Sequence, residues 1–225
     1  MTLYAATSNP GKLSEFATSA STQGITVLAL PGLKDMPEPV EDAPTFQGNA
    51  DRKAIAYSLL APNLLVFADD SGLEVPALQN QPGVRSARFA DDYAATHPDL
   101  STRPRESVAN RGGSGETPVF LGSKDHRNNA LLLHLMQHEP NRAARFVCNL
   151  SLARNGEVLL RAQGIAAGQL VTAPRGNDGF GYDPLFLIPS LNLTFAELPR
   201  EEKWELSHRG NAFRSLLTQL PSLVF

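Results

Sequence analysis

The stretch TLYAATSNPGKLSEF, residues 2–16, passes from a β-branched and apolar run through Asn-Pro-Gly into a lysine-led helical pattern. Residues 2–7 predict a short strand, and the apolar spacing of residues 12–23 predicts a helix behind it. Gly24 ends that helix, and ITVLAL at 25–30 predicts the next strand. The chain therefore begins with one strand-helix-strand pass.

A second pass of the same kind follows. A proline-rich, acidic loop at 31–44 leads to a helix predicted over Thr45–Ala61, with Thr45 as its N-cap. NLLVFADDSGL at 63–73 then predicts an apolar strand that ends in two carboxylates and a turn. Two such passes predict an α/β fold.

The second half of the chain departs from this alternation. Residues 91–124 show no clear period, which predicts an inserted loop. A helix is predicted again at 128–137. Residues 144–168 alternate on both sides of Asn155-Gly156, a dipeptide that a two-residue type I′ hairpin favours. An antiparallel pair at this place makes the predicted sheet mixed.

The composition is typical of a packed globular domain, since 42% of the 225 residues are hydrophobic and 19% are charged. No apolar stretch approaches the roughly 18 residues of a membrane span, and no signal-peptide pattern is present, so we expect a cytoplasmic protein without a membrane partner. The single cysteine excludes an internal disulfide scaffold. Because the net charge is −3, we expect no nucleic-acid partner, and a small anion would need a local cationic pocket.

Four stretches carry candidate chemistry, and the first is the turn before the first helix. Asn9 can cap the helix, Pro10 suits its first position, and Gly11 lets a ligand approach exposed backbone N–H groups. Lys12 adds a positive charge beside them. The arrangement suits a phosphate, although an ordinary helix start uses the same residues, and the Walker A spacing is missing.

The second stretch, FADDSGLEV, carries two adjacent carboxylates. Neighbouring side chains of a strand face opposite sides, so we assign Asp70 to a site at the strand end and Asp69 to a structural role. The Asp70 carboxylate could hold Mg²⁺, with triphosphate oxygens and waters as the other ligands. A second carboxylate could come from the acidic loop, from Glu38, Glu41 or Asp42, which could equally form a solvated charge run.

The third stretch, PRGNDGFGYDPLF at 174–186, places a glycine on each side of Phe180. The backbone can fold tightly there and leave an aromatic face and the Asp183 carboxylate available for a planar ligand. A glycine-rich turn before Pro184 is the structural alternative.

The fourth stretch, EEKWELSHRGNAFRSLLTQL at 201–220, carries an apolar helical stripe with Ser207 as its cap. His208 and Arg209 then fall in the first helical turn, where the backbone dipole disfavours cations by about 0.3–1 kcal/mol. An arginine at this place indicates an anion or an electron-rich acceptor as its partner, and Lys203 could add charge. A surface arginine bonded to a nearby carboxylate is the alternative.

Together these stretches resemble the inosine triphosphate pyrophosphatase family, whose members hydrolyse deaminated purine nucleoside triphosphates. The resemblance covers nearly the whole chain apart from the region around 91–124. The segments that carry it are ATSNPGK (6–12), TFQGNADRKA (45–54), ADDSGLEVPAL (68–78), PGVRSARFA (82–90), GFGYDPLF (179–186), TFAEL (194–198) and EEKWELSHRG (201–210).

The resemblance implies an α/β fold with a mixed, twisted sheet and flanking helices, in which two lobes enclose a central cleft. Residues 1–225 would form one such two-lobed domain with an inserted loop at about 91–124, and two copies would assemble as a homodimer. The implied reaction is attack of water on the α-phosphorus of ITP, dITP or XTP with Mg²⁺ as cofactor. The products would be the nucleoside monophosphate and pyrophosphate.

The same resemblance implies roles for individual residues. The triphosphate would be held by Thr7, Ser8, Asn9, Pro10, Gly11 and Lys12, with Ser71 beside the substrate. Mg²⁺ would be bound by Asp70, which also orients or deprotonates the water, and by Glu41. The base would be enclosed by Phe180, Gly181, Tyr182 and Asp183, with Lys203 contacting the nucleotide. The purine 6-oxo group would be recognised by His208 and Arg209.

The chain departs from the family pattern at several places. Ser8 and Gly48 stand where glycine and glutamate are common, Trp204 replaces a common asparagine, and the acidic loop is one residue shorter. Two questions stay open, namely which carboxylate binds Mg²⁺ together with Asp70 and how the site excludes GTP. Two other functions also stay open, namely a pyrophosphatase for modified or pyrimidine nucleotides and a nucleotide-binding module without hydrolysis.

Overall fold

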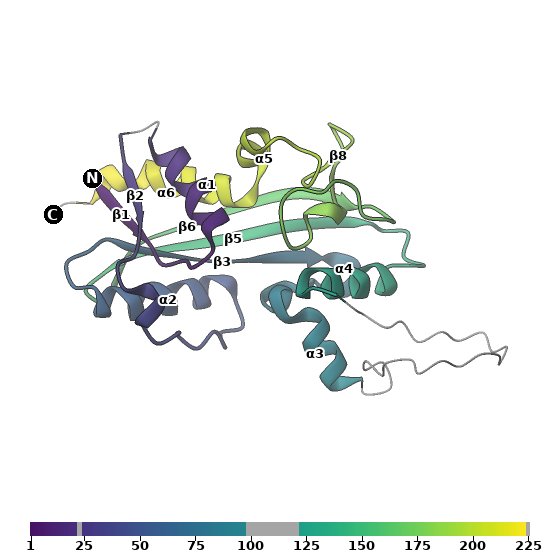
Figure 1. The fold of residues 1–225 in the computed structure, drawn as a ribbon, viewed down its shortest axis with the longest axis horizontal. Helices are drawn as coiled ribbons and strands as arrows, with labels where there is room; N and C mark the ends of the chain where they lie inside the picture. Colours follow the sequence, from purple (N-terminus) through teal and green to yellow (C-terminus); the bar gives the residue numbers. More distant parts are fainter. Residues whose placement is uncertain (22–23, 98–121, 224–225) are drawn as a thin grey trace. The chain divides into compact units, whose positions relative to one another are not determined.

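The computed structural model describes residues 1–21, 24–97 and 122–223 (Figure 1). The chain divides into two compact units. Unit 1 comprises residues 1–72, 145–167 and 199–225, and unit 2 comprises residues 73–144 and 168–198.

The strands are β1 (Thr2–Ala5), β2 (Thr26–Ala29), β3 (Val66–Val75), β4 (Gln81–Pro82), β5 (Ala143–Arg154), β6 (Glu157–Leu170), β7 (Phe186–Ile188) and β8 (Leu193–Thr194). They form a sheet in the order β2-β1-β3-β5-β6-β7-β8, with β4 paired to β3. Strand β1 pairs parallel with β2 and β3, whereas β6 pairs antiparallel with β7. The predicted mixed α/β fold is therefore confirmed.

The helices in the described part of the chain are α1 (Pro10–Ser21), α2 (Phe46–Leu60), α3 (Phe89–Thr96), α4 (Lys124–Leu135), α5 (Arg200–Leu206) and α6 (His208–Gln219). In unit 1, α1 and α6 lie on one side of the strands and α2 lies on the other (Figure 1). None of the described helices is both long and apolar enough to cross a membrane.

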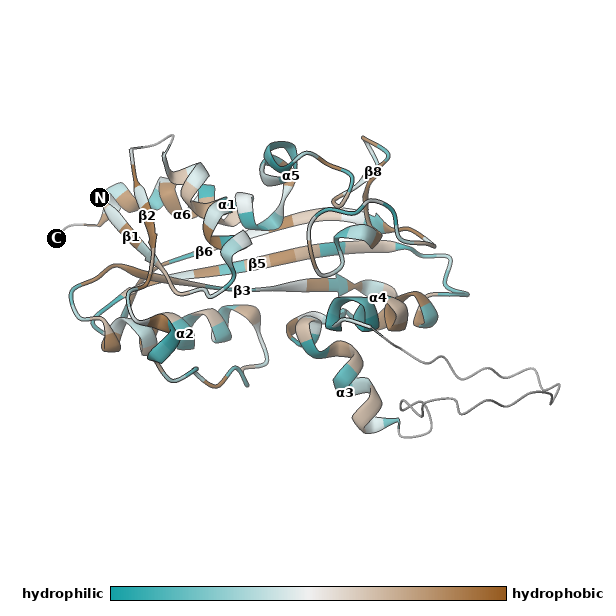
Figure 2. Ribbon diagram, viewed as in Figure 1, coloured by the Kyte–Doolittle hydropathy of each residue, from teal (hydrophilic) through white to brown (hydrophobic). Residues whose placement is uncertain are grey.

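The face of unit 1 that carries α1 and α6 has an aromatic centre. Phe16 of α1 meets Phe67 of β3 edge-on at 5.1 Å between ring centroids, and lies 4.9 Å from Phe213 of α6. Trp204 of α5 joins the cluster at 5.9 Å from Phe16. Figure 2 shows apolar residues on α6 and on the strands of this unit. Because aromatic rings bury large apolar areas, this cluster anchors both helices to β3.

The opposite face of unit 1 carries α2 through small side chains. Successive strand residues point to opposite faces, so Ala68 points away from its neighbour Phe67 and toward α2. Ala68 packs there with Ala54 of α2 and Ala153 of β5. Small side chains let the helix approach closely, and the polar residues of α2 can therefore reach the carboxylates of β3.

Unit 2 is organised around α4 and a buried tyrosine. The hydroxyl of Tyr182 donates to the carbonyl oxygen of Ser86 at 2.9 Å. Asn128 of α4 accepts a backbone N–H of α3 at 2.9 Å and so joins the two helices. Phe186 of β7 packs against Phe195 at 4.9 Å between ring centroids. These contacts define the core of unit 2.

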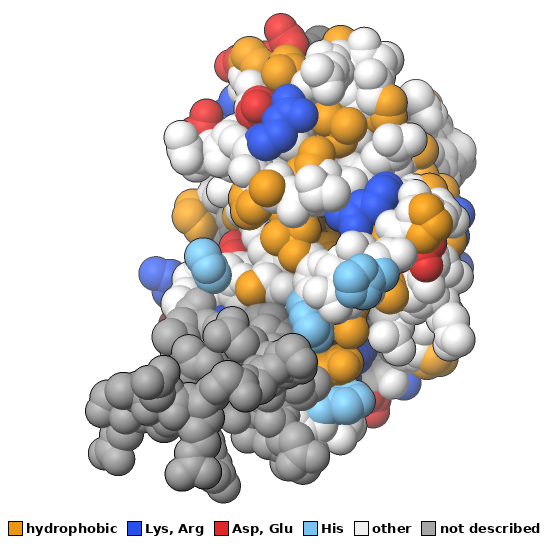
Figure 3. All heavy atoms as spheres, turned by 90° about the vertical axis from the view of Figure 1, so that its right-hand side faces the viewer, with side chains coloured by type: hydrophobic (Ala, Val, Ile, Leu, Met, Phe, Trp, Pro, Cys, Tyr) orange, Lys and Arg blue, Asp and Glu red, His pale blue; other side chains and the backbone are white. Residues whose placement is uncertain are grey.

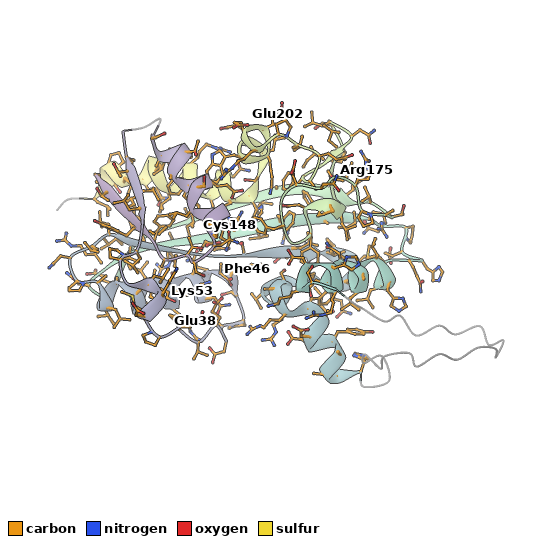
Figure 4. The ribbon with its side chains drawn as sticks, in the orientation of Figure 1. Glu38, Phe46, Lys53, Cys148, Arg175 and Glu202 are labelled. Carbon is orange, nitrogen blue, oxygen red and sulfur yellow. The ribbon has the colours of Figure 1, made fainter. Side chains whose placement is uncertain are left out.

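The sole cysteine of the sequence, Cys148 on β5, lies in the core of unit 1 (Figure 4). Burial raises the pKa of its thiol to about 12. Because the thiolate is the reactive form, Cys148 is chemically inert in the folded protein.

Two local predictions are confirmed by their backbone geometry. The helix predicted over Thr45–Ala61 is α2, and the hydroxyl of its cap Thr45 accepts the N–H of Gly48 at 3.1 Å. The hairpin is the β5–β6 pair, and both Asn155 and Gly156 adopt positive φ, at 52° and 84°. Positive φ at both central residues is the signature of a type I′ turn.

The predicted inserted loop over 91–124 is wrong at its start and at its last residue, because Lys124 begins α4. Residues 91–96 belong to α3, and residues 98–121 lie outside the described residues. Two aspartates in the first turn of α3 favour the helix, because carboxylates stabilise a helix N-terminus. Asp92 also pairs with Arg85 at 2.6 Å. The weak apolar period of this short helix hid it in the sequence.

Gly164 of β6 lets α6 lie directly against its strand within unit 1. A Cβ on Gly164 would collide with the backbone nitrogen of Ala212 and the carbonyl oxygen of His208. We expect Gly164→Ala to lower the free energy of unfolding by about 3 kcal/mol, the upper range for overpacking, as measured by urea denaturation. Ile165→Ala, at the exposed neighbouring position, should change it by only about 0.5 kcal/mol. Equal losses would contradict the close packing.

Candidate active site

The turn between β1 and α1 is closed by its own side chains. The side-chain oxygen of Asn9 accepts the backbone N–H of Gly11 at 2.8 Å and that of Lys12 at 3.1 Å. The hydroxyl oxygen of Thr7 accepts the N–H of Asn9 at 3.2 Å. Helix α1 begins at Pro10, so the predicted cap and first helical position are confirmed. Lys12 is thereby fixed in the first turn of α1.

Lys12 pairs with Asp69 of β3, with 2.7 Å between Nζ and Oδ2. The Asp69 side chain is buried, and Nε of Arg209 lies 3.9 Å from the same oxygen. Burial by itself raises the pKa of Asp69, but the neighbouring cations, Lys12 first, lower it below its usual value. Asp69 therefore stays ionised and joins two cations, in agreement with its predicted structural role.

Arg209 extends from the N-terminus of α6 into the interior, and only 4% of its side chain is exposed. Its Nη1 pairs with Glu15 of α1 at 3.0 Å, and its Nη2 donates to the Ser71 hydroxyl at 3.5 Å. The alternative of a surface arginine is therefore wrong, although the guanidinium does pair with carboxylates. These contacts hold its donors in a fixed direction beside Ser71.

His208 precedes Arg209 and is also buried. Its ring stacks on Phe146 of β5, with 4.6 Å between centroids and 12° between planes. Burial lowers the pKa of His208 well below its usual value, and the charges of Arg209 and Lys203 lower it further. The imidazole is therefore neutral at pH 7. Its Nδ1 has no hydrogen-bond partner among the residues that the structure describes, which makes it a candidate ligand contact.

Asp70 faces the other side of β3, toward α2. Its Oδ2 accepts an amide hydrogen of Asn49 at 3.0 Å, and its Oδ1 lies 3.6 Å from Nζ of Lys53. Lys53, labelled in Figure 4, also pairs with Glu41 at 3.0 Å. Burial raises the pKa of Asp70, and the Lys53 charge and the Asn49 hydrogen bond offset only part of this rise. Asp70 is thus a stronger base than an exposed aspartate.

Sequence reasoning missed Asn49 and Lys53. The two residues are four positions apart on α2 and so share one face of the helix. The apolar pattern of α2 identifies its buried stripe but not the polar side chains at the edge of that stripe. An asparagine and a lysine at this spacing, just after an acidic loop, are the signal that could have found them. Glu15 was also missed, since nothing in α1 marks it as the partner of an arginine far along the chain.

The carboxylates of Glu41 and Asp70 could together hold one divalent cation. Glu41 and Asp70 both reach the ammonium group of Lys53, so two carboxylates already share one positive charge. Asp42 pairs with Arg52 instead, which favours Glu41 as the partner of Asp70. Within the described ranges, no group of three or more His, Cys, Asp or Glu side chains could hold a metal. Mg²⁺ commonly binds through one or two carboxylates plus substrate phosphates and waters, and this pair suits that mode.

The predicted base-binding loop lies in unit 2. Gly179 and Gly181 adopt left-handed φ of 80° and 60°, and Phe180 between them is exposed. Oδ2 of Asp183 accepts the N–H of Phe180 at 2.8 Å. The interpretation that the Asp183 carboxylate is available for a ligand is wrong, because this side chain is buried and closes the loop. A Cβ on Gly179 would collide with it, so glycine is required there.

The structure places the predicted site residues in two groups. Unit 1 holds Thr7, Ser8, Asn9, Pro10, Gly11, Lys12, Glu41, Asp70, Ser71, Lys203, His208 and Arg209. Unit 2 holds Phe180, Gly181, Tyr182 and Asp183. In unit 1 the ion pairs join α1, β3 and α6, and the carboxylates of β3 and the acidic loop meet α2.

The chain matches a known protein family and several known proteins over nearly its whole length. A model of the Ham1 family matches residues 3–111 and 114–219. The dITP/XTP pyrophosphatase of Acidobacterium capsulatum is 46% identical over 221 residues, which cover 98% of each chain. The dITP/XTP pyrophosphatase of an Exiguobacterium species is 41% identical over 220 residues, which cover 98% of this chain and 97% of the relative.

Solved structures agree with the sequence matches. The Ham1 protein of Staphylococcus aureus aligns with a TM-score of 0.74 at 31% identity, covering 99% of each chain. A HAM1 protein from Coxiella burnetii aligns with a TM-score of 0.76 at 29% identity, covering 99% of this chain and 100% of that chain.

The buried, neutral imidazole of His208 makes stability depend on pH. Its folded pKa lies below the unfolded value near 6.5, so protons bind the unfolded state first and acid favours unfolding. We expect the free energy of unfolding to fall as the pH drops from about 7 to about 5. For one proton, the free energy of unfolding changes by at most about 1.4 kcal/mol per pH unit. Urea denaturation across this pH range measures it.

His208→Gln is the control for this slope, because glutamine is polar but does not titrate. The other four histidines are His97, His126, His134 and His138, which all belong to unit 2. Histidine side chains are visible on the surface in Figure 3. Both proteins keep these four, so the difference between their slopes reports on His208 alone. Identical slopes would show that the buried imidazole does not resist protonation.

Proposed function

The chain belongs to the Ham1 family, and on this premise we propose that it hydrolyses noncanonical purine nucleoside triphosphates. The substrates are ITP, dITP and XTP, and the products are the nucleoside monophosphate and pyrophosphate. The observation that carries the proposal is the full-length similarity to dITP/XTP pyrophosphatases. The ion pairs that gather Lys12, Asp69 and Arg209 in unit 1 support it.

The balance of charge in unit 1 supports a metal cofactor. The ion pairs of the site join three cations, Lys12, Lys53 and Arg209, to four carboxylates, Glu15, Glu41, Asp69 and Asp70. Even with Lys203 added, the positive charges only equal the negative charges and leave no excess for a triphosphate, whose transfer chemistry needs charge neutralisation. We therefore assign Mg²⁺ as the cofactor, held by Asp70 and Glu41.

The proposed chemistry is attack of water on the α-phosphorus. When bound, Mg²⁺ supplies charge neutralisation and lowers the pKa of a coordinated water. Asp70 orients the attacking water and accepts its proton. Asn49 fixes the carboxylate of Asp70 through the 3.0 Å hydrogen bond, and Lys53 holds Glu41 close to it. Positioning and charge, rather than covalent catalysis, dominate phosphoryl chemistry of this kind.

The proposed substrate contacts are assigned within each unit by itself. The triphosphate is held by Thr7, Ser8, Asn9, Pro10, Gly11 and Lys12, with Ser71 and Lys203 as further nucleotide contacts. The base is held by Phe180 and Gly181, while the buried side chains of Tyr182 and Asp183 fix the loop that carries them. The position of Lys12 in the first turn of α1 supports the first assignment, because the dipole at a helix N-terminus favours anions. The N–H groups of Gly11 and Lys12 themselves donate to Asn9. The exposed ring of Phe180 supports the second, since it can stack on a planar base.

Arg209, with His208, provides the proposed base selectivity. Hypoxanthine and xanthine present an acceptor at position 6 and a donor at N1, whereas adenine reverses both. A guanidinium has only donors, so it matches the 6-oxo acceptor of hypoxanthine or xanthine and would meet the 6-amino group of ATP donor against donor. The ion pairs with Glu15 and Asp69 keep Arg209 from turning away. Rejection by unpaired buried polar groups reaches about 10⁴-fold.

The assembly and location of the protein belong to the same proposal. We infer a cytoplasmic homodimer in which each chain is one two-lobed pyrophosphatase domain. The family resemblance supports this arrangement.

A nucleotide panel tests the proposed substrates. We expect kcat/KM for ITP, dITP and XTP to exceed that for ATP by about 10³- to 10⁴-fold, because the 6-amino group of adenine would face the donors of Arg209. Released pyrophosphate would be measured for these four nucleotides and for GTP and dUTP. Comparable turnover of ATP would overturn the assigned selectivity. A preference for dUTP would instead support a pyrimidine nucleotide pyrophosphatase.

Substitution of Asp70 tests the proposed mechanism. We expect Asp70→Asn to lower kcat by about 10²- to 10⁴-fold, the usual contribution of a general base, because the amide cannot accept the proton. Excess chelator should abolish the activity of the unaltered protein. Pyrophosphate release under a Mg²⁺ titration measures both effects.

Two glutamates of the acidic loop give a matched pair for the metal. Glu41→Gln should raise the Mg²⁺ concentration that gives half the maximal rate, because it removes one proposed ligand. Glu38→Gln should leave that concentration unchanged, since the exposed Glu38 (Figure 4) lies outside the proposed site. Full activity in chelator, or equal effects of the two substitutions, would contradict the assigned metal site.

A further inference from the structure

In unit 2, the backbone N–H and the backbone carbonyl of Gly181 are both held by side chains of α4. The N–H of Gly181 donates to Oδ2 of Asp125 at 2.7 Å. The side-chain amide of Asn129 donates to the carbonyl oxygen of Gly181 at 2.9 Å. Asp125 and Asn129 are four residues apart and so lie on one face of the helix. The Asp125 carboxylate thus accepts from the backbone donor, and the Asn129 amide donates to the backbone acceptor.

The tip of the loop that contains Gly181 is also restrained from its C-terminal side. Gly179 and Gly181 both adopt positive φ, and glycine restricts the backbone least. Asp183 holds the N–H of Phe180 from the C-terminal side of the loop, at 2.8 Å. Tyr182 is anchored in the core. The contacts from α4 therefore complete the restraint on the residue that follows Phe180.

The surface beside this contact is hollow. A cavity of about 360 Å³ is lined by Asp125 and Asn129 on α4 and by Phe180 and Gly181 on the loop. The loop therefore has space into which it can shift when its hydrogen bonds to the helix are removed. Asp125 itself is well placed, because a carboxylate in the first turn of a helix is stabilised by the backbone dipole.

We propose that Asp125 and Asn129 are positioning residues for the nucleotide base. They fix the backbone of Gly181 on both sides of its Cα and thereby the orientation of the neighbouring Phe180 ring. This inference rests on the proposed function, in which Phe180 receives the base. Neither residue contacts a phosphate or the reacting water in this proposal, so their loss should weaken binding of the base and leave the chemical step intact.

The test is a set of paired substitutions in the full chain. Asp125→Ala and Asn129→Ala should each raise KM for ITP about tenfold, the effect of losing one such hydrogen bond, with kcat changed by less than about twofold. Asp125→Asn keeps an acceptor for the Gly181 N–H and should retain a KM near that of the unaltered protein. Asn129→Asp sets an acceptor against the Gly181 carbonyl and should raise KM at least as much as Asn129→Ala.

Two controls separate positioning from general damage. Inorganic tripolyphosphate carries no base, so its inhibition constant should stay within about twofold in every variant. His126→Ala changes a residue on the same turn of α4 that lines the same cavity and should leave KM unchanged. A parallel rise in the tripolyphosphate inhibition constant, an unchanged KM in the alanine variants, or failure of Asp125→Asn to retain KM would overturn the inference.

The outcome is distinguishable from failure of the proposed function. If the unaltered protein binds ITP without hydrolysing it, the proposed function fails, and the dissociation constants of ITP for the same variants decide the positioning role. If the unaltered protein hydrolyses ITP and the alanine variants match it, only the positioning role fails. If it neither binds nor hydrolyses ITP, both fail.

Discussion

The buried carboxylate of Asp69 is the group on which the site of unit 1 depends. A charge removed from water is costly unless opposite charges face it, and Lys12 and Arg209 do so from the starts of two different helices. One strand residue therefore fixes both cations and ties α1 and α6 to β3. Removal of one partner from a buried pair typically costs about 3–5 kcal/mol, because the remaining charge is left uncompensated. Geometry of the site and stability of the unit are thus coupled.

The alternation of β3 gives two identical neighbouring side chains opposite properties. Asp69 faces the side of α1 and α6, where cations lower its pKa, and Asp70 faces α2, where burial raises its pKa. Titratable groups whose environments push their pKa values apart commonly divide catalytic from supporting roles. The small side chains beneath α2 make this possible, since they bring Asn49 and Lys53 within reach of Asp70.

Features set by neighbours in sequence could be predicted, and those set by distant residues could not. The cap at Thr45 and the hairpin at Asn155-Gly156 follow from local hydrogen bonds and backbone preferences, so the sequence is sufficient for them. The direction of the Asp70 side chain, toward α2, follows from strand alternation. The burial of Arg209 does not, because its partner Glu15 is 194 positions away. Helix α3 was missed for a related reason, since its contacts with α4 stabilise a segment whose own pattern is weak.

The inert thiol of Cys148 has a practical consequence. Maleimide reagents attack thiolates, and a side chain buried in a core with a strongly raised pKa offers them none. A cysteine introduced at an exposed position of the loop that carries Phe180, such as Asn177, would therefore be the sole point of dye attachment without removal of the native residue. Fluorescence from such a conjugate would follow that loop alone while nucleotide is added.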